Sequence, residues 1–207
     1  MSRASLRSAA PALALSALVL LPFLGKAFTI DDTLFLKQAE HVLSDPLHPT
    51  AFVTVWSDVP LRMSQIMPSG PVMAYLLVPC VRFGGAEWIA HLGQICLLWL
   101  ALLATASLAL RLGLGSAGAT AASLLVAAAP SALAMAGTAM PDVPAMALGA
   151  AGVERLLAWR DERRLRDAVL ASIALALAAL ARSHLGLVLG AAALLVPGGF
   201  GWPRRLR

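Results

Sequence analysis

Two adjacent carboxylates, Asp31 and Asp32, are the first side chains along the chain that could do chemistry. They follow an apolar stretch over residues 9–28, which is long enough to cross a membrane. A carboxylate at such a boundary can act as a general base, which takes the proton of a hydroxyl group that reacts with a lipid-linked substrate. Either residue could instead cap the helix that follows, because Asp is a favoured N-cap residue. The sequence leaves both roles open.

A third carboxylate, Asp142, lies in the segment Met140-Pro141-Asp142-Val143-Pro144, where one apolar run ends and the next begins. An ionisable side chain at the end of a membrane span is costly to place there, which makes it a candidate functional group. The alternative role is again a helix N-cap, with Pro144 in the first turn.

A basic turn, Arg182-Ser183-His184, separates apolar runs over residues 168–181 and 185–196. Both runs are shorter than the roughly 20 residues of a full span, so we expect the turn to lie below the membrane surface. A guanidinium group binds phosphate oxygens in pairs, and Arg182 is therefore a candidate phosphate ligand, with His184 as a neighbouring candidate. Alternatively, Arg182 extends to lipid headgroups and His184 is an interfacial turn residue.

Metal chemistry has little support in the sequence. Residues 40–48 contain two histidines and two acidic side chains, but their spacing matches no known metal motif. Cys80 and Cys96 belong to no CxxC or His-containing cluster. We therefore predict no cofactor, and a divalent metal held by residues 40–48 is the alternative.

The composition excludes a water-soluble globular protein. Of the 207 residues, 59% are hydrophobic and 13% are charged, and the mean hydropathy is +0.80, whereas soluble domains are about half apolar and a quarter charged. The formal net charge is +5, and most basic residues lie between apolar runs, with few aromatic residues among them. This distribution is typical of residues that orient a membrane protein, and it does not indicate nucleic-acid binding.

The elements that must position these side chains are mostly membrane spans. We predict an all-α integral membrane protein in a single domain, with a first span within residues 1–28, an outer loop over residues 29–87, five further spans over residues 88–197 and a tail over residues 198–207. The apolar runs that carry the six predicted spans are residues 9–28, 88–110, 117–136, 143–158, 168–181 and 185–196.

The outer loop is predicted to carry two helices at the membrane surface. Residues 33–44 form an amphipathic pattern, with Phe35, Ala39, Val42 and Leu43 on one face. The apolar run over residues 71–83 would cover only about 20 Å as a helix, so we expect it to lie at the interface.

The positive-inside rule sets the predicted orientation. It places the amino terminus, the turn at Arg111, the loop over residues 154–167 and the carboxyl tail in the cytoplasm of a bacterial-type cell, with the chain in the inner membrane. The Arg-rich loop over residues 154–167 is expected to be solvated. A small-x-small triplet at residues 25–27 also resembles a signal cleavage site, but the preceding stretch is long enough to remain as a span.

Four segments together resemble a known family: Asp31 to Glu40 with Asp45-Pro46-Leu47, Pro68-Ser69-Gly70-Pro71 to Leu76, Met140 to Pro144, and Ala178 to His184. Their order and spacing are similar to those of the membrane-embedded GT-C glycosyltransferases, in particular the branch of protein O-mannosyltransferases and lipid A aminoarabinose transferases (glycosyltransferase family 39 and relatives).

The resemblance implies transfer of a sugar from a polyprenyl-phosphate donor to an acceptor on the outer face. Asp31 or Asp32 would match the general base, Asp142 the second outer acidic residue, and Arg182 a residue facing the carrier phosphate. Family members commonly carry Lys-Pro-Pro where this chain has Pro68-Ser69-Gly70-Pro71, and Arg62 is a candidate substitute for the missing lysine.

Such enzymes usually have further spans and often a soluble domain, so the chain is similar to the amino-terminal half of the fold. We expect a second polypeptide to supply the other half, besides the sugar donor and membrane lipid as partners; a truncated or inactive product is the alternative.

Two other functions stay open. One is a non-catalytic subunit that binds lipid or partner helices through small-residue faces such as Gly149 and Gly152. The other is a transporter fragment in which Asp142 and Arg182 form an ion pair at the membrane midplane.

Overall fold

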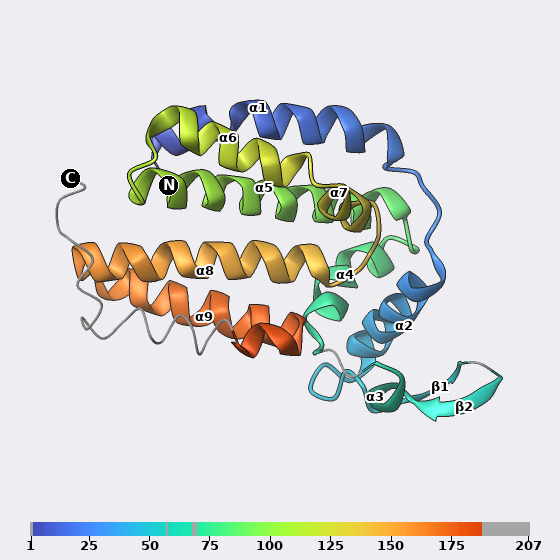
Figure 1. Cartoon of the computed structure of the whole chain (residues 1–207). Helices are drawn as coiled ribbons and strands as arrows, with labels where there is room; N and C mark the ends of the chain where they lie inside the picture. Colours follow the sequence, from blue (N-terminus) through green and yellow to red (C-terminus); the bar gives the residue numbers. More distant parts are fainter. Residues whose placement is uncertain (1, 57, 68–69, 188–207) are drawn as a thin grey trace.

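The computed structural model describes residues 2–56, 58–67 and 70–187, which are mostly helical (Figure 1). The α-helices are α1 (Arg3–Leu20), α2 (Ile30–Ser44), α3 (Met63–Ile66), α4 (Val72–Arg82), α5 (Glu87–Arg111), α6 (Gly115–Ala127), α7 (Pro130–Ala136), α8 (Asp142–Glu162) and α9 (Leu165–Ala181). Short 3₁₀ helices follow α1 and α9, namely η1 (Leu21–Phe23) and η2 (Ser183–Leu185). Strands β1 (Val53–Trp56) and β2 (Val59–Arg62) form a hairpin.

Within the part of the chain that the structure describes, two helices are long and apolar enough to cross a membrane. The first is α1 continued by η1, over Arg3–Phe23, and the second is α5, with 25 residues. These match the first two predicted spans and support a membrane protein. The bent pair α6 and α7 adds a third span if both helices cross together. Six spans therefore remain a prediction, and the run over residues 185–196 lies mostly outside the described residues.

The predicted span over residues 117–136 is broken in the structure, because α6 and α7 meet at an angle of 60°. The cause is Pro130, the first residue of α7. Proline has no backbone N–H group and disfavours helical geometry in the residue before it. Ala129 accordingly has φ −66° and ψ 121°, which is extended backbone.

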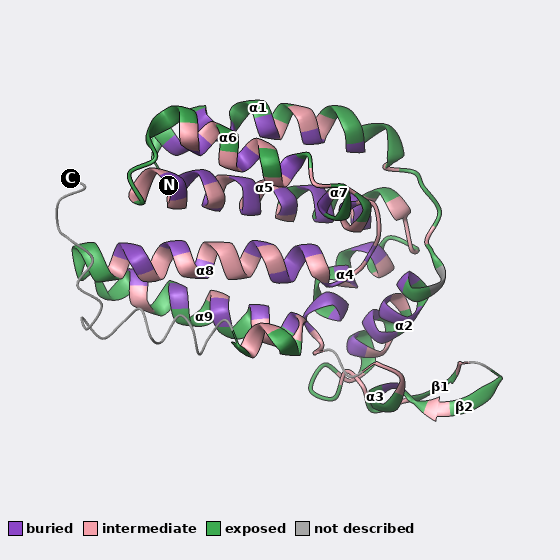
Figure 2. Cartoon of the chain, in the orientation of Figure 1, coloured by how far each residue is buried: buried purple, intermediate pink, exposed green. Residues whose placement is uncertain are grey.

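The long helices lie side by side, and the described core is made largely of alanine and leucine (Figures 1 and 2). Figure 2 shows buried residues along α5, which lies between α6 and α8. Helices α8 and α9 approach closely at Gly152, where a Cβ atom would lie 2.6 Å from Leu175 Cγ. Small residues allow such close packing of helices in membranes.

The two ends of the bundle differ in character. At one end, Ser2, Arg111, Glu154 and Arg164 line one cavity, so the start of α1, the end of α5 and the link between α8 and α9 lie together. At the other end lie α2, α4, α7 and the first residue of α8 (Figure 1). The chain therefore separates the arginine-rich segments from the segments that carry the candidate site.

The predicted outer loop contains both expected helices. Helix α2 buries Phe35, Ala39 and Val42 as predicted, whereas Leu43 is 41% exposed and does not belong to the buried face. Helix α4 has 11 residues, about 16 Å of helical rise, which is too short to cross a membrane.

The hairpin was not predicted and corrects the all-α expectation. Its strands pair antiparallel from Val53 with Arg62 to Trp56 with Val59. Pro60 lies in β2, which is an edge strand and therefore tolerates a residue without a backbone N–H group.

Candidate active site

Asp142 and Arg182 form an ion pair although they are 40 residues apart in the sequence. Arg182 Nη2 donates to Asp142 Oδ2 at 2.6 Å. Asp142 is the first residue of α8 and Arg182 is the first after α9, so the antiparallel packing of these helices brings the two groups together. The N-cap of α8 is Pro141, so the alternative that Asp142 caps this helix is wrong.

Both members of the pair keep capacity for a further partner. The side chain of Asp142 is 35% exposed and that of Arg182 is 28% exposed. The Nε atom of Arg182 is buried and has no hydrogen-bond partner among the described residues. A buried donor without a partner is costly, so an anion that reached this atom would be stabilised.

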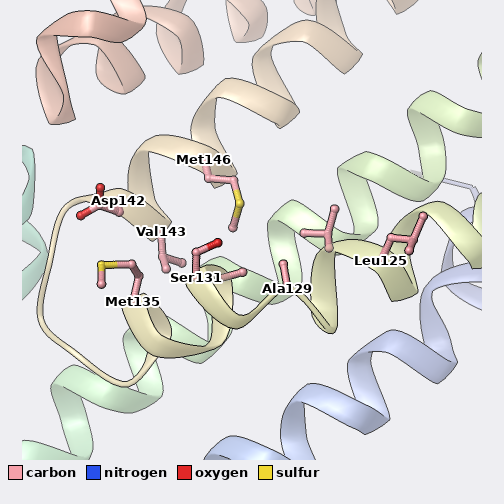
Figure 3. Close-up of a pocket in the computed structure, with 9 residues that line it drawn as sticks. Leu125, Ala129, Ser131, Met135, Asp142, Val143 and Met146 are labelled. Carbon is pink, nitrogen blue, oxygen red and sulfur yellow. The ribbon is translucent and has the colours of Figure 1, made fainter.

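An apolar cavity of about 490 Å³ extends from Asp142 between α6, α7 and α8. Figure 3 shows Asp142 at one end and Leu125 at the other, with Met135, Val143 and Met146 between them. The bend between α6 and α7 contributes Ala129 to the lining. The arrangement suits a ligand with an apolar chain and a polar end.

Asp32 is fully buried and accepts three hydrogen bonds. Its Oδ2 atom accepts from the backbone N of Thr29 at 2.8 Å and from Thr29 Oγ1 at 2.7 Å. Its Oδ1 atom accepts from the backbone N of Ala139 at 2.9 Å. The N-cap of α2 is Thr29, and neither Asp31 nor Asp32 holds that position. Asp32 therefore joins α2 to the segment that leads into Asp142.

Asp31 is exposed, in contrast to its buried neighbour. Because Asp32 contacts Ala139, Asp31 belongs to the same end of the bundle as the Asp142–Arg182 pair. Of the two adjacent carboxylates, Asp31 is therefore the one that is accessible from solvent.

A close backbone approach brings a second predicted segment to Arg182. A Cβ atom on Gly70 would lie 1.7 Å from the backbone oxygen of Leu180, so only glycine fits at this position. Gly70 therefore lies directly against the last turn of α9. This contact lies two residues before Arg182.

The other two predicted binding residues are exposed. His184 lies in η2, two residues after Arg182. Arg62 ends β2, in the hairpin that projects from the bundle (Figure 1), and its side chain forms no ion pair with the residues that the structure describes. The structure therefore joins Asp142 directly to Arg182 and joins Asp32 to Ala139, three residues before Asp142, whereas Arg62 is not joined to them.

Three side chains near this site were not predicted. Lys26 Nζ donates to the Gly137 oxygen at 3.0 Å, and Gln94 Nε2 donates to the Met140 oxygen at 2.8 Å. His91 Nε2 lies 2.9 Å from the Lys26 oxygen. Sequence patterns give no sign of these contacts, because each has a backbone oxygen as its partner.

The expectation of a solvated loop over residues 154–167 is confirmed for residues 160–166, which are exposed, and is wrong for Glu154 and Asp167. Helix α8 continues to Glu162, and Glu154 and Asp167 are only 3% and 1% exposed. Glu154 Oε1 accepts from Ser107 Oγ at 2.8 Å and from Arg111 Nε at 3.0 Å, and Glu154 also pairs with Arg155. Arg155 Nη1 donates to Asp167 Oδ1 at 2.9 Å. Burial of a charged side chain without an oppositely charged partner is energetically unfavourable, and these side chains are partners for one another.

Residues 40–48 contain a simple pair. His48 Nδ1 lies 3.0 Å from Asp45 Oδ1, and this hydrogen bond lowers the pKa of Asp45 from its ordinary value. Among the described residues, no group of three or more His, Cys, Asp or Glu side chains could hold a metal ion.

Replacing His48 with Ala should raise the pKa of Asp45 towards its ordinary value, because the hydrogen bond that favours the ionised carboxylate is removed. The native pair contributes to stability above the ordinary carboxylate pKa, and that contribution is lost as the pH falls through the lowered value. An NMR titration of the Asp45 carboxylate would measure the change. A His41→Ala variant is the control, and an equal change in both variants would contradict the assignment to His48.

Comparisons of the chain with protein-family models, with curated proteins and with solved structures found no match.

Proposed function

We propose that the chain is a membrane glycosyltransferase of the GT-C kind, which transfers a sugar from a polyprenyl-phosphate donor to an acceptor hydroxyl group. The observation that carries the proposal is the meeting of four segments at one end of the bundle. Asp32 contacts Ala139, Gly70 contacts Leu180, and Arg182 contacts Asp142. The segments that carry the family resemblance are thus adjacent in space although they are far apart in the sequence.

Asp31, Arg182 and Asp142 each have a role in the proposed transfer. Asp31 accepts the proton of the acceptor hydroxyl group as its oxygen attacks the anomeric carbon. The bond between that carbon and the phosphate oxygen breaks, and the phosphate leaves with the electron pair. Arg182 stabilises the charge that develops on the leaving phosphate, and Asp142 holds the guanidinium group through Nη2.

The apolar cavity beside Asp142 supports a lipid-linked donor. Its volume of about 490 Å³ accommodates several isoprene units, and at one end it reaches Asp142, the ion-pair partner of Arg182. An isoprenoid chain in the cavity would leave its phosphate near Arg182. We further propose that the site faces the outside of a bacterial-type inner membrane, that the amino terminus is cytoplasmic and that a second polypeptide completes the fold.

A transporter fragment is the alternative that the ion pair itself raises. A bent helix pair and an intramembrane ion pair are features of transporters. However, Asp142 begins α8 and Arg182 follows the end of α9, so the pair lies at the helix ends and not midway along them. This placement favours a site at the membrane surface, where a lipid-linked donor meets a water-soluble acceptor.

The test is transfer of radiolabelled sugar in proteoliposomes from a panel of polyprenyl-phosphate sugars. Replacing Arg182 with Gln should lower transfer about 10- to 100-fold and raise the KM for the donor, because hydrogen bonds to a charged group contribute about 1.5–3 kcal/mol. Arg160→Gln is the matched control, since Arg160 is an exposed arginine whose one ion-pair partner among the described residues is its neighbour Asp161.

Two results would contradict the proposal. One is the absence of transfer by the native chain with every donor, both alone and with a co-expressed second polypeptide. The other is an equal decrease in the Arg182→Gln and Arg160→Gln variants, because a general loss of positive charge would then explain the effect.

A further inference from the structure

We infer that Asp32 is a positioning residue, which fixes the loop over residues 137–141 so that Asp142 meets Arg182. The effect of Asp32 on sugar transfer rests on the proposed function. The effect of Asp32 on the path of the 137–141 loop does not depend on that function. The deciding observation is that Asp32 uses both carboxylate oxygens to hold backbone and hydroxyl groups of two separate segments.

The 137–141 loop is held by side chains from outside its own helices. Lys26 binds the Gly137 oxygen, Asp32 binds the Ala139 nitrogen and Gln94 binds the Met140 oxygen. These partners are 111, 107 and 46 residues away in the sequence. The loop leads directly into Asp142, so its path sets where that carboxylate lies.

The central contacts are removed from solvent. Asp32 and Ala139 are 0% exposed, and Gln94 is 1% exposed. Water cannot readily replace a hydrogen bond at such a position, and loss of one partner leaves a buried polar group unsatisfied. The Asp32–Ala139 contact is therefore expected to decide whether the loop keeps this path.

Helix α5 carries two of the side chains that hold these segments. His91 and Gln94 lie on one face of α5, three residues apart. His91 contacts the Lys26 oxygen, and Gln94 contacts the Met140 oxygen. The segment before α2 and the 137–141 loop are thus both anchored to the same end of α5.

The position requires a carboxylate and not merely a polar side chain. All three partners of Asp32 are donors: two groups of Thr29 and the Ala139 nitrogen. A carboxylate is an acceptor at both oxygens, whereas an amide presents an NH₂ group on one side. When the oxygen of an Asn at position 32 accepts from both Thr29 groups, its NH₂ group faces the Ala139 nitrogen, a donor against a donor, so the Ala139 contact is the one that is lost.

The first test measures the loop without reference to activity. Hydrogen exchange of the peptide that covers the 137–141 loop should become at least tenfold faster at Ala139 in Asp32→Asn than in the native chain in lipid nanodiscs. Thr29→Val removes a hydroxyl donor from Asp32 but leaves Ala139 bound, so exchange at Ala139 should remain native. Gln94→Leu should also speed exchange in the loop. This substitution leaves α2 unchanged, so it tests the loop even if Asp32→Asn fails to fold.

The second test compares transfer kinetics. Asp32→Asn should lower kcat while the pH dependence of transfer remains native, because the base, Asp31, is unchanged. Unchanged exchange at Ala139 in both Asp32→Asn and Gln94→Leu would overturn the inference. So would abolished transfer in Asp32→Asn with native exchange, which would identify Asp32 as the base.

The two proposals fail in different ways. If the native chain transfers no sugar but Asp32→Asn speeds exchange in the loop, the proposed function fails and the role of Asp32 in the loop stands. If the native chain transfers sugar and exchange is unchanged in both loop variants, the positioning role fails and the function stands.

Discussion

Replacing Asp31 with Asn is expected to lower the rate of sugar transfer about 100- to 10,000-fold, which is the range for loss of a general base. Asn has nearly the same size as Asp but cannot accept the proton of the acceptor hydroxyl group. Asp31 is exposed at the start of α2, so the substitution leaves the buried contacts of Asp32 in place. The decrease should therefore appear in kcat, with little change in the KM for the donor. Steady-state transfer in proteoliposomes measures both quantities.

Glu40→Gln provides the matched control for this substitution. Glu40 is also an exposed acidic residue of α2, and it lies more than two helical turns beyond Asp31. Its neutralisation removes one negative charge from the same helix but should leave transfer nearly unchanged. Full activity of Asp31→Asn would show that the proton goes elsewhere, and abolished activity of Asp142→Asn in the same assay would then indicate Asp142 as the acceptor.

The contact between Asp142 and Arg182 could be predicted from sequence as a hypothesis. Two apolar runs joined by a short polar link form an antiparallel pair of helices, which places the start of the first beside the end of the second. The hypothesis of a transporter fragment included this ion pair, and the structure confirms the contact at 2.6 Å. The contact follows from the order of the two helices along the chain, so its prediction requires no knowledge of side-chain packing.

The partners of Asp32 could not be predicted in the same way. The sequence marked Asp32 by its position after a span, which is equally true of Asp31. What separates the two is that Asp32 faces the backbone of Ala139, 107 residues later in the sequence. A backbone N–H group is present at almost every residue, so no sequence pattern identifies which one a buried carboxylate meets.

The buried network around Glu154 illustrates a different limit. The residues over positions 154–167 alternate in charge, and such alternation usually indicates a solvated surface. The signal that could have revealed the network lies on α5, where Ser107 and Arg111 are four residues apart and share one face. Only the packing of α5 against α8 shows that this face meets Glu154.

Helix α8 links this network to the candidate site. Asp142 begins the helix, and Glu154 lies 12 residues further along, about 18 Å by helical rise. Glu154 fixes α8 against α5 through Ser107 and Arg111. A change at Glu154 therefore acts on the helix that carries Asp142, although it is remote from the site itself.

Replacing Glu154 with Ala is expected to destabilise the protein by about 3 kcal/mol, the lower end of the range for removal of one partner from a buried ion pair. The lower end applies because the side chains of Arg111 and Arg155 are 24% and 21% exposed and regain some contact with water. Both guanidinium groups lose a partner, as does the buried hydroxyl group of Ser107. Reversible unfolding in detergent micelles, followed by circular dichroism, measures the change.

Glu162→Ala separates burial from charge in this experiment. Glu162 also pairs with Arg111, as well as with Arg164, but its side chain is 35% exposed. Ion pairs near the surface contribute about 0–1 kcal/mol, so this variant should remain close to the native stability. Equal destabilisation of the two variants would mean that net charge at this end of the bundle, and not the buried position of Glu154, holds α8 against α5. Native stability of Glu154→Ala would mean that apolar packing alone fixes α8, and the placement of Asp142 would then be independent of the network.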